Sequence, residues 1–413
     1  MKILHLGYSD KSGGASIAMM RLHKSLKELD VESNVLVGEK NTNDHNIFGP
    51  ETSLEKKINM FKIKLARQKK YFYGHNGKYS HSLNVFSSKI ISKINKIKPN
   101  IINLHWVNNE LISIKEISRL KIPIVWTFND MWPMCGGEHY VEDSRFQFGY
   151  NITSKRHDET GFDLNKYIWN IKKKFWKSKI DHVVCISSWL KFKAEQSYLF
   201  KNHKISSIPC AINLDKWKPV DQIFARESLN LPKNKIILLF MSTNGTSDLR
   251  KGFKYLNSGL NYISNFYNDI VLLNVGNNEK MPIQDERIIN VNKLFNGDPK
   301  TLSLYYSASD ILITPSILEA LGQVAIEAGA CGVPSIGFKS TGLEDTIKHK
   351  KTGYLSTYLD QNDFNNGLKW TIEQIKKDKE YFRIECQNFV KNNFASEIIA
   401  KKYIEIYKNI LKL

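Results

Sequence analysis

Two glutamates eight residues apart, Glu319 and Glu327, carry the clearest chemical pattern in this sequence. They flank the predicted start of a helix near Gly322, where free N–H groups and a partial positive charge favour a phosphate. A carboxylate beside a phosphate is unfavourable unless it accepts hydrogen bonds from hydroxyl groups. A single glutamate there could simply complement the helix dipole at the surface. The pair predicts a ligand with sugar hydroxyls on both sides of a phosphate, which describes a nucleoside diphosphate sugar.

A basic pair, Arg250 and Lys251, stands before Gly252, between a predicted strand and a predicted helix. On a chain with a formal net charge of +19, most such pairs are solvated surface residues. Ligands of parallel sheets, however, bind at the carboxyl ends of the strands, where this pair lies. We therefore expect the two cations to converge on an anionic ligand in a cleft between domains.

Gly13 and Gly14 end the first apolar run and precede a helical pattern. Glycines let the backbone approach an anion at a helix start, so the pair could face a phosphate. A plain structural turn is an equal alternative. The third glycine of the G-x-G-x-x-G spacing is missing, and no acidic residue ends the second strand, which disfavours a nicotinamide dinucleotide.

These residues need elements to position them, and the apolar pattern supplies strands alternating with helices. In the first half, the predicted strands are residues 2–8, 33–37, 101–104, 124–127 and 182–186. After a proline-bearing stretch at 208–219 the pattern restarts, with strands at 236–241, 271–275, 288–291, 311–314 and 335–337 and helices from about Lys251 and Gln323. Residues 381–413 are predicted to be helical. Alternation of this kind predicts the α/β class, with two doubly wound parallel sheets.

The stretch from Glu319 to Glu327 resembles the E-x7-E signature of the retaining glycosyltransferases of the GT-B fold, in their family four. The resemblance implies two Rossmann-like domains facing a cleft, residues 1–207 on the acceptor side and 208–391 on the donor side. A carboxyl-terminal helix at about 392–413 would complete the first domain. It also implies roles in donor binding and catalysis. Glu319 would bind the donor sugar and Glu327 the ribose. The diphosphate would be bound by the backbone of Leu321 and Gly322, by the glycine loop Gly13-Gly14, and by Lys251 with Arg250.

Four further stretches look like motifs of the surface-polysaccharide subfamily, namely residues 103–108, 126–133, 136–140 and 186–190. The first three resemble acceptor-side motifs. They imply acceptor-side roles for His105, Trp106, Asp130, Trp132 and His139. For His105 a structural role, hydrogen-bonded to backbone, is the alternative, and His139 is equally open.

Three positions depart from the family pattern. Asn129 stands where the family usually has a histidine that contacts the reacting groups, and an amide can hydrogen-bond but cannot transfer a proton. No arginine follows the first strand of the second domain, since residues 241–245 hold no cation, and Arg250 is the expected substitute. Glu138 replaces one of the cysteines that many subfamily members carry after the paired glycines.

The basic charge is concentrated in residues 51–100, which hold eleven Lys and one Arg against two Glu. Within residues 55–73, Ile58, Phe61, Leu65 and Phe72 fall near one helical face with lysines around them, as in an interfacial helix on anionic lipid. A solvated helix packed on its own domain is the alternative. Nucleic acid is not the expected partner, because no nucleic-acid motif accompanies the charge.

The cysteines and the lengths of the apolar runs indicate the cellular compartment in which the protein works. Its five cysteines have no C-x-x-C spacing, and this predicts neither a zinc site nor a disulfide framework and fits a reducing compartment. The apolar run at the amino terminus is too short for a signal peptide, and no apolar run in the sequence is long enough to span a bilayer. We expect a cytoplasmic protein, peripheral on the inner face of the cytoplasmic membrane.

Together these patterns predict a retaining hexosyltransferase that moves a sugar from a nucleoside diphosphate sugar to a saccharide, which could be lipid-linked, in surface-polysaccharide synthesis. No cofactor or metal is expected, because Lys251 and Arg250 would neutralise the departing diphosphate. Two alternatives share the donor site: a nucleotide-sugar epimerase of the same fold, and a non-catalytic sugar-nucleotide-binding protein, which Asn129 would suit. A nucleic-acid binder would fit the charge alone.

Overall fold

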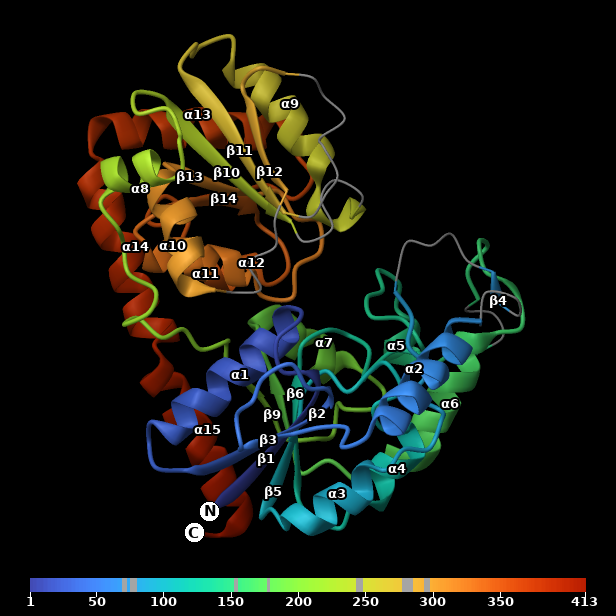
Figure 1. Ribbon diagram of the computed structural model, residues 1–413. Helices are drawn as coiled ribbons and strands as arrows, with labels where there is room; N and C mark the ends of the chain where they lie inside the picture. The colour runs from blue at the N-terminus through green and yellow to red at the C-terminus, as the bar shows by residue number, and fades with distance from the viewer. Residues whose placement is uncertain are drawn as a thin grey trace. The chain divides into compact units, whose positions relative to one another are not determined.

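The computed structural model describes residues 1–68, 73–74, 80–151, 155–176, 179–242, 248–276, 285–292 and 298–413. The chain divides into two compact units. Unit 1 is Met1–Pro209 with Ile399–Leu413, and unit 2 is Cys210–Ile398. Each has its own parallel sheet covered by helices (Figure 1). The predicted α/β class with two Rossmann-like domains is confirmed.

The sheet of unit 1 has the described strand order β3-β2-β1-β5-β6-β8-β9, with all neighbours parallel. Its strands are β1 (Lys2–Ser9), β2 (Glu32–Glu39), β3 (Ile47–Phe48), β5 (Ile101–Leu104), β6 (Ile124–Phe128), β8 (His182–Cys185) and β9 (Ile205–Ser207). The central strands are buried on both faces, which is why they read as unbroken apolar runs in the sequence. A separate antiparallel pair joins β4 (Tyr73–Gly74) to β7 (Thr160–Gly161).

Helices connect the strands of unit 1 and cover its sheet (Figure 1). They are α1 (Gly14–Lys27), α2 (Ser53–Arg67), α3 (Ile90–Ile97), α4 (Ile114–Arg119), α5 (Arg145–Phe148), α6 (Leu164–Trp176), α7 (Ser188–Gln196) and α15 (Ser396–Leu411). The last of these is contributed by the carboxyl terminus. Its Tyr403 and Tyr407 hydroxyls lie 3.1 Å from Thr127 Oγ1 and 2.7 Å from the Asn103 amide. The carboxyl-terminal helix is therefore part of the first unit's core.

The sheet of unit 2 has the described order β12-β11-β10-β13-β14-β15, again with parallel neighbours. Its strands are β10 (Ile236–Ser242), β11 (Ile270–Gly276), β12 (Ile288–Asn292), β13 (Ile311–Thr314), β14 (Ser335–Phe338) and β15 (Gly353–Ser356). The helices are α8 (Gln222–Ser228), α9 (Phe253–Ile263), α10 (Pro299–Ala308), α11 (Gln323–Ala330), α12 (Leu343–Thr346), α13 (Gln361–Lys377) and α14 (Lys379–Phe394).

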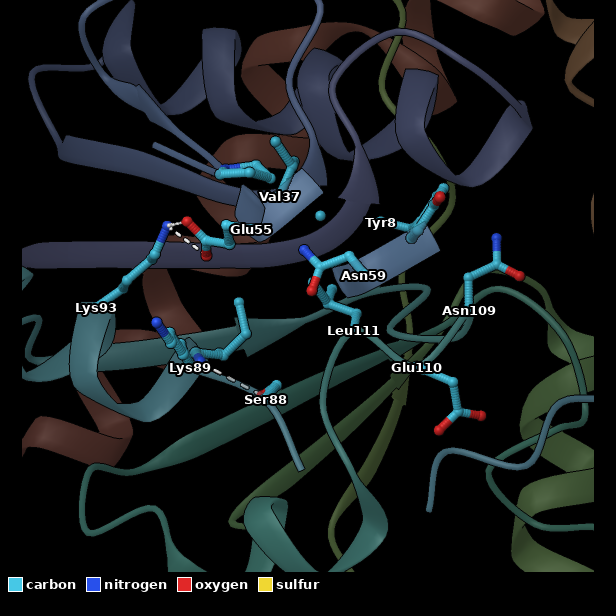
Figure 2. A pocket seen from close by; sticks show the side chains of 13 residues that line it. Tyr8, Val37, Glu55, Asn59, Ser88, Lys89, Lys93, Asn109, Glu110 and Leu111 are labelled. Atoms are coloured by element: carbon cyan, nitrogen blue, oxygen red, sulfur yellow. Dashed lines mark hydrogen bonds and ion pairs between the residues drawn. The ribbon is translucent and has the colours of Figure 1, made fainter. Parts of the chain in front are cut away.

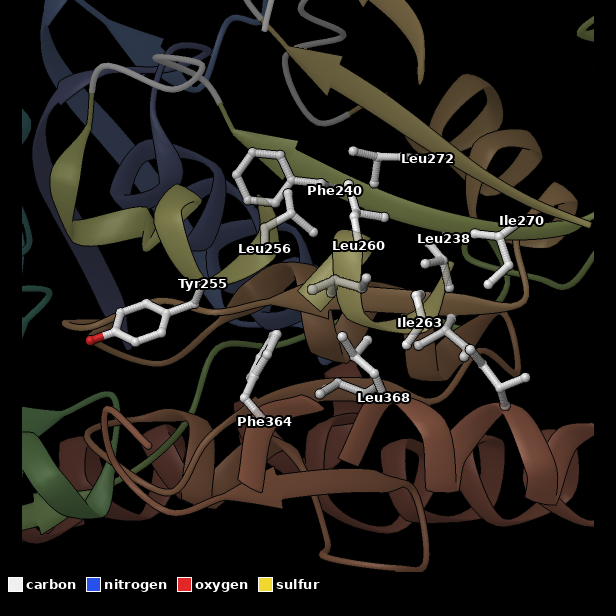
Figure 3. Packing of buried hydrophobic residues seen from close by; sticks show 14 of the residues in the cluster. Leu238, Phe240, Tyr255, Leu256, Leu260, Ile263, Ile270, Leu272, Phe364 and Leu368 are labelled. Atoms are coloured by element: carbon white, nitrogen blue, oxygen red, sulfur yellow. The ribbon is translucent and has the colours of Figure 1, made fainter. Parts of the chain in front are cut away.

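One apolar cluster fixes α9 and α13 against the sheet of unit 2 (Figure 3). Leu256 and Leu260 of α9 meet Phe364 and Leu368 of α13 there, above Leu238 and other strand residues. Each such side chain contributes roughly 1.5–3 kcal/mol on burial. This packing fixes the two helices relative to strands β10 and β13.

Two helix boundaries differ from those predicted. The helix expected from Lys251 starts at Phe253, after a 3-10 turn over Leu249–Lys251, because Gly252 has a φ of 66° that ends the turn in the left-handed region. The helical segment predicted for 381–413 is broken at Ala395. There the chain is extended and pairs with Ile212, whose N–H donates to the Phe394 carbonyl.

Candidate functional site

In unit 2, the two loops that carry the predicted donor-side residues touch each other. Lys251 Nζ donates to Glu319 Oε2 at 2.6 Å, and both side chains remain partly exposed. The Ile317 N–H donates to the Arg250 carbonyl at 2.7 Å, which ties the loop after β13 to the turn before α9. The structure therefore brings together Lys251 and Glu319, which lie 68 residues apart in the chain.

Gly252 is required for this contact between loops. A Cβ at this position would lie 1.8 Å from the Pro315 carbonyl oxygen, and the φ of 66° is one that other residues rarely adopt. Glycine thus allows the backbone of one loop to approach that of the other closely. This places the Lys251 side chain beside the loop that holds Glu319.

The Arg250 side chain pairs with Asp248, a residue that was not predicted from the sequence. Its guanidinium donates to both carboxylate oxygens of Asp248, at 3.0 and 2.7 Å. Burial alone would raise the pKa of Asp248, but the hydrogen bond and charge of Arg250 lower it. The D-x-R spacing is the local signal that could have predicted this fork. Arg250 is thus oriented by Asp248. Residues 243–245, part of the stretch where the family arginine is absent, lie outside the described residues.

The start of α11 lies directly after Glu319. Gly322 has a φ of 87°, and a Cβ there would meet Leu343 Cδ2 at 2.6 Å, so this turn also favours glycine. Leu321 is buried beside it. The Gly342 N–H donates to the Glu319 carbonyl at 2.8 Å and holds the turn from the other side. The loop that presents the helix start is therefore fixed by backbone contacts.

Glu327 lies one helical turn further into α11 and is buried. The Tyr306 hydroxyl of α10 donates to its Oε2 at 2.9 Å. Tyr306 is fully buried and was not predicted as a site residue, because a tyrosine within an apolar helix gives no functional signal in the sequence. It fixes the orientation of the Glu327 carboxylate.

In unit 1, Gly13 is the N-cap of α1, with a φ of 89°. Both Gly13 and Gly14 are exposed, and no atom lies within 4 Å of a Cβ built on Gly13, so its conformation rather than crowding favours glycine. Nearby, Ser9 Oγ accepts the N–H groups of Lys11 and Ser12. Asp10 accepts the N–H groups of Asn41 and Thr42, so the loop is held both by its own residues and by the segment after β2.

Asp130 joins three other predicted acceptor-side residues, Trp106, Trp132 and His139, into one group. It follows β6, and its carboxylate accepts the Trp106 Nε1–H at 2.9 Å, the Trp132 N–H at 2.9 Å and the His139 Nδ1 at 2.6 Å. The His139 Nε2 lies 2.8 Å from Ser82 Oγ, a residue that was not predicted. Ser82 is 57 residues from His139 in the chain, so no local sequence pattern could have indicated the contact.

Lys172 is a second functional candidate that the sequence did not reveal. It is fully buried in α6, and its ammonium donates to the carbonyls of Trp132, Cys135 and Gly136 while lying 3.7 Å from the centre of the Trp132 ring. Burial lowers the pKa of Lys172 to about 7. This single side chain fixes the turn that follows Asp130.

His105 lies outside the Asp130 group. Its Nε2 is 2.9 Å from His5 Nδ1 in the interior of unit 1, and burial lowers its pKa to about 3. The side-chain partner is thus another histidine rather than the backbone. Asn129 is partly buried, and its Nδ2 donates to the Thr127 carbonyl at 3.1 Å.

Glu138, at the position of a subfamily cysteine, is completely buried. Arg145 donates to its Oε1 at 2.7 Å and the Tyr150 hydroxyl to its Oε2 at 3.2 Å. Burial raises the pKa of Glu138, although the charge of Arg145 opposes this. The ion pair of Glu138 with Arg145 therefore holds the segment that includes His139. The five cysteines of the chain are all buried and form no disulfide.

The basic helix α2 exposes apolar side chains. None of its residues is buried, and Met60, Phe61 and Leu54 are 69, 64 and 68% exposed. Leu54, Ile58, Phe61 and Leu65 share one face at helical spacing. Lys69, Lys70 and Phe72, part of the predicted interfacial segment, lie outside the described residues. In the described part of the chain, no helix is both long and apolar enough to cross a bilayer.

A pocket lies beside α2 at the carboxyl end of β1 (Figure 2). The ion pair of Glu55 with Lys93, at 2.9 Å, lies at one end, and Tyr8 and Asn109 line the other. The Tyr8 ring is in edge contact with Trp106, 6.2 Å between centroids. Tyr8 therefore lines the pocket and also contacts Trp106 of the Asp130 group. Within the described ranges, no three His, Cys, Asp or Glu side chains are grouped to hold a metal.

Solved structures share this fold over the whole chain. The sucrose-phosphate synthase of Thermosynechococcus elongatus superposes with a TM-score of 0.68 at 19% identity, covering 100% of both chains. The Anabaena protein HepE, solved in complex with UDP-glucose, gives 0.63 at 15% identity, covering 99% of this chain and 100% of its own. At such identities the likeness shows the fold alone.

Sequence comparisons show the family. An uncharacterised 41.2 kDa protein of the cps region of Klebsiella pneumoniae is 24% identical over 82% of this chain and 87% of its own length. The Staphylococcus aureus capsular polysaccharide biosynthesis glycosyltransferase CapM is 25% identical over 56% and 62%. The family model "Glycosyltransferase Family 4" matches residues 12–216, and "Glycosyl transferases group 1" matches residues 221–392. Since the two models in succession take in most of the sequence, the chain belongs to family 4 of the glycosyltransferases.

Proposed function

We propose that this glycosyltransferase moves a hexose from a nucleoside diphosphate sugar to a saccharide acceptor in cell-surface polysaccharide synthesis, with retention at the anomeric carbon. The observation that carries the proposal is the contact of Lys251 with Glu319, 2.6 Å apart, directly before α11. It joins a cation suited to a diphosphate and a carboxylate suited to sugar hydroxyls at one helix start.

Each donor-side group has a distinct task in this proposal. Lys251, with Arg250 oriented by Asp248, neutralises the diphosphate as it departs, and the backbone at Leu321 and Gly322 binds its oxygens. Glu319 holds the sugar where positive charge develops. Glu327, whose carboxylate is fixed by Tyr306, accepts hydrogen bonds from the ribose. The cations do the work that a divalent ion does elsewhere, so the proposed transfer is metal-independent.

The proposed acceptor is a saccharide, carried on a lipid, and the enzyme is peripheral on the cytoplasmic face of the membrane. The support is α2, whose apolar face is exposed between lysines. Lysines attract the anionic lipids of the cytoplasmic leaflet, and exposed apolar side chains enter the interface. The pocket of Figure 2 links α2 to Tyr8 and so to Trp106. The names of the cps-region and CapM relatives agree with polysaccharide synthesis as the setting.

Ligand-induced stabilisation tests the donor. A thermal-shift panel of nucleoside diphosphates and their sugars should show a selective rise, since a ligand that binds the folded state stabilises it. Glu327→Ala should weaken donor binding, and Glu319→Ala should lower turnover strongly. Tyr306→Phe is the matched control, because it keeps the Glu327 carboxylate and removes only the hydroxyl that orients it. Unchanged affinity and turnover in both glutamate variants would refute the site.

One observation favours a second candidate, a non-catalytic protein that binds sugar nucleotides. Asn129 cannot transfer a proton, and its amide already donates to the Thr127 carbonyl. Tight donor binding without turnover over a panel of acceptors would support this candidate. Release of free, epimerised sugar without an acceptor would instead indicate an epimerase. A product with the donor's anomeric configuration, read by NMR, would support retaining transfer.

A further inference from the structure

The loop that follows β14 holds the backbone of Glu319 at two points. Thr341 Oγ1 accepts the Glu319 N–H at 3.1 Å, and the next residue, Gly342, donates its N–H to the Glu319 carbonyl at 2.8 Å. We propose that Thr341 is a positioning residue, which sets the Glu319 carboxylate for the donor sugar through this hydrogen bond. The proposal rests on the donor site proposed above and adds to it the residue that orients its sugar-binding carboxylate.

Thr341 has a backbone conformation that a branched side chain disfavours. Its φ is 55°, in the left-handed region, where a β-branched residue is an outlier. Such residues persist only where the surrounding structure imposes the conformation, and they concentrate at functional sites. Glycine would adopt this φ at lower cost, but it has no hydroxyl for the Glu319 N–H. What threonine offers at this position is therefore the hydrogen bond to Glu319.

Close packing keeps this loop against the one that carries Glu319. The two loops follow β14 and β13, which are neighbours in the sheet. A Cβ placed on Gly342 would lie 2.3 Å from the Ala320 carbonyl oxygen, so glycine allows the two backbones to approach closely. The fully buried Leu343 continues the contact, since its Cδ2 would meet a Cβ on Gly322 at 2.6 Å. Thr341 is thus held where its hydroxyl meets the Glu319 N–H.

The Glu319 side chain is held at one oxygen only, so its direction depends on the backbone. Its Oε2 accepts Lys251 Nζ at 2.6 Å, and the Ser316 hydroxyl lies 3.4 Å from the same oxygen. No residue in the described ranges donates to Oε1, and the side chain is partly exposed. A carboxylate held at one oxygen can still swing about that contact, whereas a fixed backbone sets the direction of the other oxygen. The two anchors together aim Oε1 at a hydroxyl of the donor sugar.

Three variants of Thr341 separate the hydroxyl from the strain. Thr341→Val removes the hydroxyl and keeps the branched shape, Thr341→Gly removes both, and Thr341→Ser keeps the hydroxyl. With the sugar nucleotide that stabilises the wild type most in the thermal-shift panel, kcat should fall about tenfold in Thr341→Val and Thr341→Gly, the effect of one hydrogen bond lost from the transition state. Thr341→Ser should stay within twofold of the wild type. Affinity for the corresponding nucleoside diphosphate should not change in any of them.

A purely structural role would give a different pattern. Thr341→Gly relieves the strain that Thr341→Val keeps, so the melting temperatures of these two variants should differ while their kcat values agree. Thr352→Val is the matched control, because Thr352 Oγ1 accepts the Lys348 N–H at 2.9 Å just before β15, at the opposite edge of the parallel sheet. This control loses the same kind of bond and should leave kcat unchanged. A kcat within twofold of wild type in either Thr341→Val or Thr341→Gly, or an equal loss in Thr352→Val, overturns the proposal and leaves the donor site intact.

Amide exchange tests the contact without a donor. In hydrogen–deuterium exchange of the free protein read by NMR, the Glu319 amide should exchange about tenfold faster in Thr341→Val and Thr341→Gly than in the wild type or Thr341→Ser, because its acceptor is gone. Equal exchange in all four proteins overturns the role of Thr341, whatever the donor is. A wild-type protein that shows this exchange pattern but neither binds a sugar nucleotide nor transfers a sugar would overturn the proposed function instead.

Discussion

Asn129 tests whether the departing diphosphate and the acceptor-side groups suffice for catalysis without the family histidine. Its amide donates to the Thr127 carbonyl, which orients it beside Asp130. If it positions the donor sugar, Asn129→Ala should lower kcat about tenfold through the loss of hydrogen bonds, whereas Asn129→His should be tolerated. Steady-state kinetics of the two variants decide this.

Two other results for Asn129 would change the interpretation. Full activity in Asn129→Ala would show that this residue does not contact the reacting groups. A wild-type protein that binds donor but transfers nothing, and is restored by Asn129→His, would be a degenerate family member whose role is binding. Donor binding measured beside the kinetics separates these cases.

Buried histidines make unit 1 sensitive to acid. Burial lowers the pKa of His105 to about 3 and of His23 to about 4, and that of His5, beside them, lies well below its ordinary value. Between about pH 6 and pH 4 the unfolded chain binds protons that the folded chain does not, so the free energy of unfolding falls as pH falls. Each such histidine contributes a slope of about 1.4 kcal/mol per pH unit.

This acid sensitivity can be measured with one substitution. His105→Asn removes the group that titrates and should reduce the slope of unfolding free energy against pH by about 1.4 kcal/mol per unit between pH 6 and 4. Urea unfolding of the wild type and the variant over this range gives both slopes. Equal slopes would show that His105 becomes protonated in the folded protein.

At the scale of elements, α2 is the segment whose role depends on its surroundings. If its exposed apolar face and lysines bind anionic lipid, Lys56→Gln, Lys57→Gln and Lys64→Gln together should weaken vesicle binding about a hundredfold, since each lysine near the surface contributes about 1 kcal/mol. Binding of the wild type should also fall with rising salt. Vesicle sedimentation with anionic and neutral lipids measures this.

A matched variant separates the location of charge from its amount. Lys391→Gln, Lys402→Gln and Lys408→Gln remove the same charge from exposed positions of α14 and α15. This variant should bind anionic vesicles almost as the wild type does. Equal losses in the two triple variants, or equal binding of the wild type to neutral vesicles, would argue against α2 as the anchor.

The sequence predicted the central elements best because burial leaves a local signature. The strand at 311–314 is found as β13 with the same bounds, since a parallel strand covered on both faces is apolar throughout. The short edge strands β9 (Ile205–Ser207) and β15 (Gly353–Ser356) were not predicted, because they are brief and partly polar. The start of α9 was misplaced because the backbone angle of Gly252 is not readable from its neighbours.

The residues of the candidate site also divide into those that local sequence patterns predicted and those that they did not. Glu319 and Lys251 were predicted from local motifs, and the structure adds their contact. Ser82 and Lys172 were missed, because their contacts arise only when segments 36 or more residues apart pack together. Local chemistry is therefore readable from the sequence, whereas the partners that orient it are set by tertiary structure.

At the scale of the whole molecule, the chain builds two units with separate sheets and then returns to the first. The carboxyl-terminal helix α15 gives Ile399, Tyr403 and Tyr407 to the interior of unit 1. The Tyr407 hydroxyl bonds the Asn103 amide on β5. Unit 1 is therefore complete only when α15 has been made, whereas the sheet and core cluster of unit 2 lie within Cys210–Ile398.

Truncation after Ile398 tests this division of stability. Removing residues 399–413 exposes apolar surface of unit 1 and leaves buried polar groups of β5 and β6 without their tyrosine partners, so the unfolding transition of unit 1 should move far down in temperature or disappear. Tyr407→Phe, which removes one hydroxyl at a cost of about 1 kcal/mol, should lower it by only about 2–4 °C. The transition of unit 2, and its stabilisation by a nucleoside diphosphate sugar, should not change in either variant. Scanning calorimetry with and without the nucleotide resolves the two transitions, and a parallel shift of both would show that the units unfold as one.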